Sequence, residues 1–128
     1  MQLVGPYNSG VAVGANGAAL ASADQKVTIS GKLVGIYVKY NVSCPSSTVV
    51  TIKTLGGGAP SYNLLAVPAG NTAGLFLVGQ TMVNAAGAAL TFDGTHGAIQ
   101  GIPIYDGINV AITLANAACN ADVWLFLE

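Results

Sequence analysis

Charge is scarce in this sequence. Its 128 residues include four lysines, no arginine and five acidic residues, so charged residues make up 7% of the chain, against about 25% in ordinary soluble domains. Without arginine and with a net charge of −1, the chain lacks the cations that neutralise nucleic-acid phosphates or bind anionic membranes. We therefore expect neither a nucleic-acid nor a membrane partner. A surface with so few charges is typical of a protein that other subunits cover.

Side chains that perform catalysis or bind metals are also rare. The chain has one histidine and two cysteines, and its five carboxylates are scattered along the sequence. His96 closely follows Asp93, and two interpretations are open: a general base or metal ligand paired with Asp93, or simply the chemistry of a turn. No Cys/His cluster and no calcium-loop spacing occurs. We predict no catalytic, cofactor-binding or metal site, and no enzymatic activity.

Long apolar runs are missing as well. The mean hydropathy is +0.61, but the most apolar stretch, residues 64–79, is interrupted by Pro68, Gly70 and Asn71. A membrane-spanning helix needs about 20 uninterrupted apolar residues. The first residues have neither the positively charged region nor the apolar region of a signal peptide, so we expect synthesis in the cytoplasm without that route of export.

The two cysteines, Cys44 and Cys119, both lie in loops between consecutive expected strands. Both loops fit at one end of a sandwich, where a disulfide would close a loop of about 75 residues and stabilise the fold by several kcal/mol. The alternative is a pair of free, partly buried thiols in a reducing cytoplasm. A disulfide requires release of the protein into an oxidising environment.

Apolar and polar residues alternate with a period of two along most of the chain, which is typical of β-strands. The clearest strand is 32–41, where Val34, Ile36, Val38 and Tyr40 share one face. The other expected strands are 26–30, 48–55, 63–67, 74–80, 88–92, 102–105, 108–114 and 122–127. Turn sequences such as Asp93-Gly94 and Asp106-Gly107 separate them. The pattern predicts an all-β, single-domain β-sandwich of jelly-roll or immunoglobulin-like type.

The first 24 residues differ from the rest. They are rich in Gly, Ala, Asn and Ser and have no strong strand pattern. We predict an extended N-terminal arm over residues 1–24, followed by the sandwich domain over residues 25–128. An ordinary first edge strand, or a frayed end, is the alternative. The apolar residues through which such an arm would contact a capsid subunit are Leu3, Val4, Val11, Val13 and Leu20.

About three-quarters of the chain, from residue 31 to the last residue, contains a series of β-type segments in a particular order. These are Gly35-Ile36-Tyr37-Val38-Lys39-Tyr40, Thr48-Val49-Val50-Thr51-Ile52-Lys53-Thr54, Gly87-Ala88-Ala89-Leu90-Thr91-Phe92-Asp93-Gly94, Ile102-Pro103-Ile104-Tyr105-Asp106-Gly107-Ile108-Asn109-Val110 and Val123-Trp124-Leu125-Phe126-Leu127-Glu128. In this order they resemble small bacteriophage virion proteins encoded near the capsid genes. The resemblance implies a β-sandwich head protein of the decoration, cement or minor capsid kind, and it transfers no site residues. The absence of arginine and the cysteine pair depart from that group's pattern.

Together, the composition and the resemblance predict a structural protein of a virus particle. We expect a capsid decoration or cement protein that stabilises the shell through apolar contacts between subunits. Its expected partners are capsid subunits and copies of itself, with a trimer favoured, and its expected location is the virion. The alternative is a carbohydrate- or receptor-binding module of the adhesin type, whose candidate residues are Tyr62 with Asn63, and Tyr105 with Asp106. Trp124, by contrast, fits core or interface packing.

Overall fold

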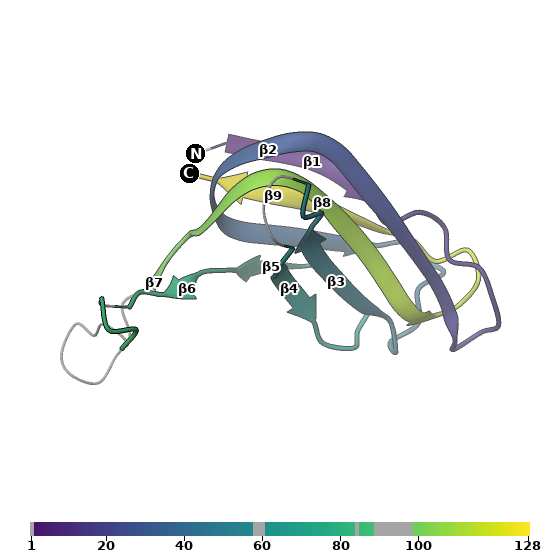
Figure 1. Ribbon diagram of the computed structural model, residues 1–128. Coiled ribbons are helices and arrows are strands. Elements are labelled where there is room, and N and C mark those ends of the chain that lie inside the picture. Colours follow the sequence, from purple (N-terminus) through teal and green to yellow (C-terminus); the bar gives the residue numbers. More distant parts are fainter. Residues whose placement is uncertain (1, 58–60, 84, 89–98) are drawn as a thin grey trace.

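The structure is a computed structural model that describes residues 2–57, 61–83, 85–88 and 99–128 (Figure 1). These residues contain no helix, so the described chain is all-β, as the period-two pattern predicts. Its strands are β1 (Gln2–Asn8), β2 (Ala19–Tyr40), β3 (Val49–Thr54), β4 (Asn63–Val67), β5 (Gly74–Leu77), β6 (Gln80–Thr81), β7 (Ile99–Gln100), β8 (Ile102–Ala115) and β9 (Ala121–Leu127).

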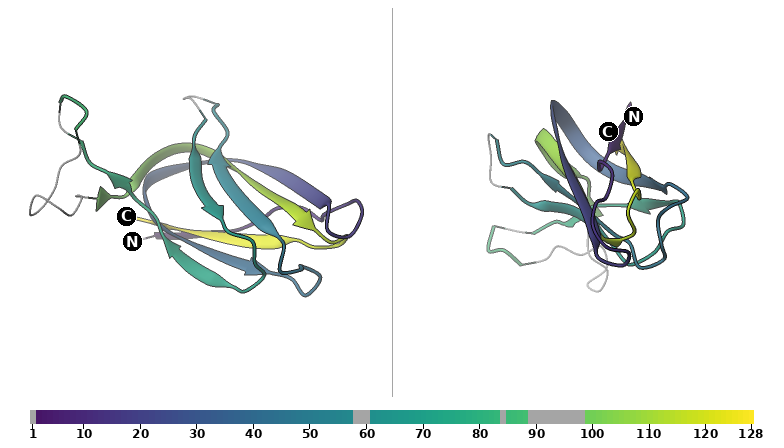
Figure 2. Two further views of the ribbon diagram at one scale, coloured as in Figure 1. Left: turned by 90° about the horizontal axis from the view of Figure 1, so that it is seen from below. Right: turned by 90° about the vertical axis from the view of Figure 1, so that its right-hand side faces the viewer.

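Seven of these strands form one antiparallel sheet. Its order is β1-β9-β2-β8-β3-β4, and β5 pairs with β2 beside this path. β6 and β7 form a separate hairpin that projects from the body of the molecule, at the end that holds both termini (Figure 1, Figure 2). The loops that join β1 to β2, β2 to β3 and β8 to β9 lie at the opposite end (Figure 1).

The long strand β2 belongs to two groups of strands. Residues 19–33 pair with β8, whereas residues 33–40 pair with β9 on one side and β5 on the other. Between these segments the strand curves round (Figure 1). Gly31, two residues before the segments meet at Leu33, has a φ of 135°, which favours glycine. One group therefore contains β1, β9, β5 and the second segment of β2. The other group contains β8, β3, β4 and the first segment of β2.

The Asp106-Gly107 pair does not end a strand, although its sequence is typical of a turn. It lies inside β8, which is continuous from Ile102 to Ala115. The ladder between β2 and β8 shifts register at this level, between Gln25 and Ile29 of β2. A Cβ atom on residue 107 would collide with the carbonyl oxygen of Gln25, so glycine is needed here for the close approach of the two strands.

Burial alternates along the strands, so the sheet has a buried face and an outer face. In β9, Val123, Leu125 and Leu127 are buried, whereas Trp124 and Phe126 between them are only half-buried. The largest fully buried apolar side chains come from both strand groups and include Leu33, Ile36, Ile52, Ile108, Ile112 and Leu125. They belong to one hydrophobic cluster. Each contributes about 1.5–3 kcal/mol relative to an exposed position.

The N-terminal residues are part of the sheet. Residues 2–8 pair with β9 as an edge strand, and Val4 and Tyr7 pack against the core. The expected boundary at residue 24 falls inside β2. The structure thus corresponds to the edge-strand alternative and not to an arm that stands apart from the domain. The strand is hidden in the sequence because Gly5 and Pro6 lie where its register against β9 is irregular.

Candidate interaction surface

The two cysteines join two loops at one end of the molecule. Cys44 and Cys119 form a disulfide with a Cα–Cα distance of 4.7 Å. Beside it, the Asn41 backbone N–H donates to the Asn120 carbonyl at 3.1 Å. The β1–β2 loop joins the same end, because the Ala12 N–H donates to the Cys119 carbonyl at 2.8 Å. We call the three loops, residues 9–18, 41–48 and 116–120, the disulfide end.

Besides Val42 in the β2–β3 loop, four large apolar side chains are exposed at or next to the disulfide end: Val11, Val13, Leu20 and Leu114. Val13 and Leu20 exchange two backbone hydrogen bonds, at 3.1 and 3.2 Å, and Val13 is 70% exposed. Leu114 lies opposite Leu20, where an irregularity turns Thr113 and Leu114 outward together. Its φ of 53° is left-handed, which costs about 1–2 kcal/mol for a residue with a Cβ atom. We call these four residues the apolar tip.

The structure does not bring all five residues of the expected contact arm together. Val11, Val13 and Leu20 belong to the apolar tip. Leu3 is also exposed, but it lies on β1 with its register partner on β9. Val4 is half-buried and packs against the core. Three of the five residues therefore share one exposed surface, which sequence reasoning had assigned to a single continuous arm.

A second and larger apolar surface covers the outer face of β1, β9, β2 and β5. Register places Leu3 beside Phe126, Phe126 beside Gly35, and Gly35 beside Leu77. The neighbouring row runs from Trp124 through Tyr37 to Leu75. The rings of Tyr37 and Trp124 meet edge to face, with centroids 5.8 Å apart, and Leu77 is 84% exposed. We call this surface the aromatic face, formed by Leu3, Val34, Gly35, Tyr37, Leu75, Leu77, Trp124 and Phe126.

The aromatic face is corrugated. Gly35 has no side chain, and the gap above it forms a hollow of about 200 Å³ lined also by Val34, Leu75, Leu77 and Phe126. A second hollow of about 180 Å³ is lined by Leu3, Tyr37, Trp124 and Phe126. Phe126 borders both hollows and therefore forms a ridge between them. Hollows with apolar walls and an aromatic ridge are features that a second protein surface can fill.

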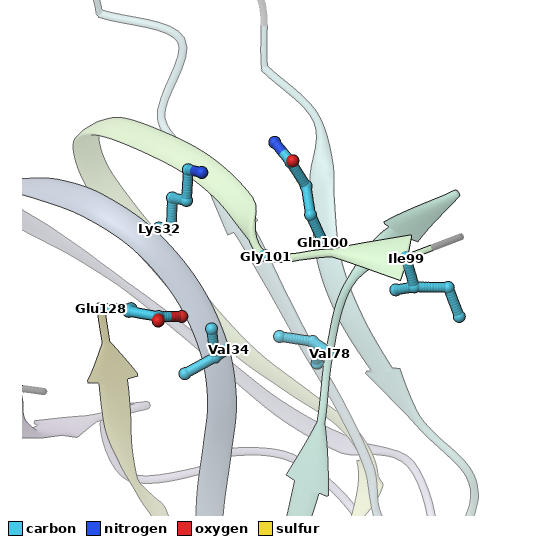
Figure 3. A pocket seen from close by; sticks show the side chains of 7 residues that line it. All are labelled: Lys32, Val34, Val78, Ile99, Gln100, Gly101 and Glu128. Atoms are coloured by element: carbon cyan, nitrogen blue, oxygen red, sulfur yellow. The ribbon is translucent and has the colours of Figure 1, made fainter. Parts of the chain in front are cut away.

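Charged residues bracket the aromatic face along the strand direction. At one end Lys39 of β2 is paired in register with Asp122 of β9. At the other end Lys32 of β2 exchanges backbone hydrogen bonds with Glu128, at 2.8 and 3.4 Å. Figure 3 shows the side chains of Lys32 and Glu128 at a hollow of about 490 Å³, which extends to the stem of the projecting hairpin. Four of the nine charged residues of the chain thus flank this one face.

The tyrosines proposed for saccharide binding do come together. Tyr62, Tyr105 and Asp106 line a hollow of about 240 Å³ with Pro103 and Ile104, and Tyr105 is 78% exposed. The Tyr62 hydroxyl donates to the Pro103 carbonyl. The Asp106 carboxylate accepts hydrogen bonds from the backbone N–H groups of Gly56 at 2.7 Å and Gly107 at 2.8 Å, which hold it in place. Asn63, the fourth candidate, is exposed on β4 and does not line this hollow.

Sequence reasoning did not identify the aromatic face. It assigned Trp124 to core or interface packing without identifying a surface, and gave Leu75 and Leu77 no role. A signal was present in the final strand: apart from Asp122, residues 121–127 are apolar at inward and outward positions alike. A strand that is apolar on both sides indicates that both of its faces are covered.

The remaining expectations concern metals, catalysis and membranes. His96, Asp93 and residues 89–92 of the expected strand 88–92 lie outside the described residues. Among the described residues, no three histidine, cysteine or carboxylate side chains gather in a group that could hold a metal ion. That part of the chain also has no helix long and apolar enough to cross a membrane. Comparison with protein-family models, curated proteins and solved structures found no match for this chain.

Proposed function

We propose that this chain is a structural protein of a virus particle, a capsid decoration or cement protein. One observation carries the proposal: the described residues include thirteen exposed large hydrophobic side chains on a chain with only nine charged residues. Such a surface favours association, because covering it removes apolar area from water at about 25 cal/mol per Å² before the entropic costs of binding. The resemblance to small bacteriophage virion proteins supports the same role.

In this proposal the apolar tip contacts the capsid subunits, and copies of the chain contact one another. The apolar tip contains three of the contact residues expected from the sequence, and the disulfide end holds it in place. A contact made by four apolar side chains is weak for one copy of the chain. A cement protein that binds several subunits at once gains affinity through multivalency. The disulfide fits a particle that is assembled inside a cell and functions outside it, since disulfides persist in oxidising surroundings.

The proposed architecture is a β-sandwich with jelly-roll or immunoglobulin-like connections. The two strand groups that share β2 would be its two layers. Support comes from the way β2 leaves one group and enters the other, because strands that bend between packed sheets are a known feature of sandwiches. The single hydrophobic cluster, with residues from both groups, also agrees with two layers around one core.

Shell binding tests the proposed role. Shells assembled from the major capsid protein of the virus to which the proposal assigns this chain are mixed with the purified full-length protein and separated on a density gradient. We expect the wild-type chain to co-sediment and a Val13→Ser/Leu20→Ser variant to bind at least about tenfold more weakly, since two central apolar contacts are lost. Val27→Ser is the matched control, because Val27 is exposed on β2 outside the apolar tip.

Point substitutions are preferable to a deletion of residues 1–24. That deletion would remove β1, the edge partner of β9, and the first residues of β2, so loss of binding would not separate contact from folding. A wild-type chain that stays at the top of the gradient contradicts the proposed role. Equal binding by wild type, variant and control would instead move the shell contact away from the apolar tip.

A saccharide-binding module is the second candidate, and the tyrosine hollow is the observation that favours it. An exposed tyrosine ring can stack on a sugar face while a fixed carboxylate accepts hydrogen bonds from hydroxyl groups. The test is a glycan array probed with the purified protein. Binding that is lost in Tyr105→Ala and Tyr62→Ala, but kept in Val27→Ser, would establish this function. A wild-type protein that binds no glycan would exclude it.

A further inference from the structure

We infer that the aromatic face binds the same face of a second copy of this chain, with β9 of each copy lying across β2 of the other. The inference rests on the proposed role of this chain as a structural subunit and names the partner for one of its surfaces. The apolar tip remains free to contact capsid subunits, because its residues lie in the β1–β2 loop and where the end of β8 meets the start of β2, and none of them lines the hollows of the aromatic face.

The charges around the face identify a second copy as the partner. Of the two acidic residues that flank the face, Asp122 lies in β9 and Glu128 directly follows it, and both lysines, Lys32 and Lys39, lie on β2. When β9 lies across β2 of the partner, Asp122 faces the partner's Lys39 and Glu128 faces the partner's Lys32. Each pairing occurs twice, because a two-fold interface repeats every contact. Placing β9 over β9 would instead oppose like charges, which is unfavourable.

The shape of the aromatic face also favours the arrangement with β9 of one copy across β2 of the other. Phe126 forms the ridge on β9, and Gly35, its register neighbour on β2, forms the floor of the adjoining hollow. With β9 across β2, the Phe126 ring of one copy enters the hollow above Gly35 of the other copy. That hollow, at about 200 Å³, is large enough for a phenyl ring. A ridge and a hollow on one surface make the surface complementary to itself, as an interface between identical subunits requires.

This pairing relates two copies, not three. A two-fold interface uses one patch on both subunits, whereas a trimer joins two different patches head to tail. The expectation of a trimer from the sequence was not based on a particular surface. The aromatic face is such a surface, and one partner copy is enough to pair all four of its flanking charges.

Native mass spectrometry and sedimentation velocity of the full-length protein measure the pairing directly. We expect a mass of two chains over a wide range of concentrations. Trp124 is the only tryptophan and lies on the face, so its fluorescence should shift to shorter wavelength as the concentration rises and the pair forms. A mass of three chains, or a single chain at every concentration, would overturn the inference.

A charge-exchange experiment identifies the face. Lys39→Glu places two acids at one end of the face, and Asp122→Lys places two lysines there. Each variant alone should dimerise at least about tenfold more weakly than wild type, because like charges meet across the interface. An equimolar mixture of the two variants should form a heterodimer of near wild-type affinity, since every contact at that end is again between opposite charges.

The heterodimer separates an interface from an effect on folding. Lys39 and Asp122 are also neighbours within one chain, so a purely internal role would leave each variant impaired in the mixture as well. Lys53→Glu on β3 is the matched control and should dimerise like wild type. Failure of the mixture to recover pairing overturns the inference. If the mixture fails to pair but the wild type still binds shells, the inference is wrong and the proposed function remains. If the protein pairs through this face but does not bind shells, the proposed function is wrong and the inference remains.

Discussion

The outer faces of the two strand groups differ sharply, although both groups contribute to one core. The aromatic face carries rings and leucines. At its centre the other group presents small and polar side chains: register aligns Ser22 with Ala111 and Thr51, and aligns Asp24 with Asn109 and Lys53. The exposed large apolar side chains of that group, Leu20, Val27, Tyr105 and Leu114, lie outside this centre. The strand β2 runs through both groups. The inward-facing positions of β2 are apolar in both groups. The two groups therefore differ only in the side chains of their outer faces.

Hydrogen bonds link the polar side chains at the centre of the second face to one another. The Asn109 side-chain amide donates to the Asp24 carboxylate at 2.7 Å and to the Ser22 hydroxyl at 2.8 Å. Water can satisfy the remaining polar atoms of such a face. The aromatic face offers water almost no polar atoms, and covering it with protein removes apolar area from water. The comparison supports the proposal that a protein partner covers the aromatic face, whereas the polar centre of the second face, away from the apolar tip and the tyrosine hollow, suits solvent.

The largest effect should come from the core that both groups share. Ile36→Ala on β2 and Ile112→Ala on β8 each remove a fully buried side chain. Ile36 belongs to the group with β9, and Ile112 belongs to the group with β3. Each should lower the free energy of unfolding by about 2–5 kcal/mol, through lost burial and the cavity left behind. Urea denaturation measures both values. A large loss for one variant and none for the other would show that the groups do not depend on one core.

Removal of the disulfide should cause the second-largest loss of stability. The double variant Cys44→Ala/Cys119→Ala should lose about 2–4 kcal/mol of stability, because the unfolded chain regains the freedom of a long loop. Denaturation of the wild-type protein with and without a reductant provides the matching control. An unchanged midpoint under reduction would mean that the hydrogen bonds around Asn41 and Ala12 hold the disulfide end together by themselves.

Breaking the polar network should cost less. Asn109→Ala removes the donor shared by Asp24 and Ser22 and should lower the free energy of unfolding by about 1–2 kcal/mol. Denaturation measures the loss, and sedimentation velocity should show the oligomeric state unchanged. A change in oligomeric state would contradict the assignment of this face to solvent.

Exposed positions on the two faces should differ in association and not in stability. Leu77→Ser and Thr51→Ser should each change the free energy of unfolding by no more than about 0.5 kcal/mol, since neither removes a buried contact. Only Leu77→Ser should weaken self-association, which sedimentation velocity measures at matched concentrations. Equal association of the two variants would remove the functional distinction between the faces.

The smallest effect is one of pH. Burial raises the pKa of Tyr40, and that of Tyr7, above the ordinary value of 10.0. A raised pKa in the folded state means that the fold favours neutral tyrosine. This stability is fully present below pH 10.0 and is lost as the pH rises through the folded-state pKa. Tyr40→Phe should therefore lose less stability than wild type on titration above pH 10.0, as measured by denaturation at each pH.

Much of the architecture follows from the sequence alone. The period of two defines most strands and the all-β class, because alternation reflects which side of a strand faces the core. It also places the buried residues of β3, together with Ile36 and Val38 of β2. It is wrong for Val34, which was expected on the same face as Ile36: the register shift between Leu33 and Gly35 buries Leu33 and turns Val34 to the outer face. The scarcity of charge, which is a property of composition, already predicts a surface with many apolar side chains. The turn predicted from the local sequence Asp106-Gly107 is wrong, because the glycine there allows two strands to approach closely and does not form a turn.

Tertiary structure alone decides which distant residues become neighbours. Leu3, Phe126, Gly35 and Leu77 form one row only because β1, β9, β2 and β5 lie side by side. No local pattern contains that order, since a strand's alternation specifies its two faces but not the strands beside it. For the same reason the pairing of Cys44 with Cys119, and the place of β1 within the sheet, depend on contacts between residues far apart in the chain. The sequence determines how much apolar surface there is, and strand order determines where it gathers.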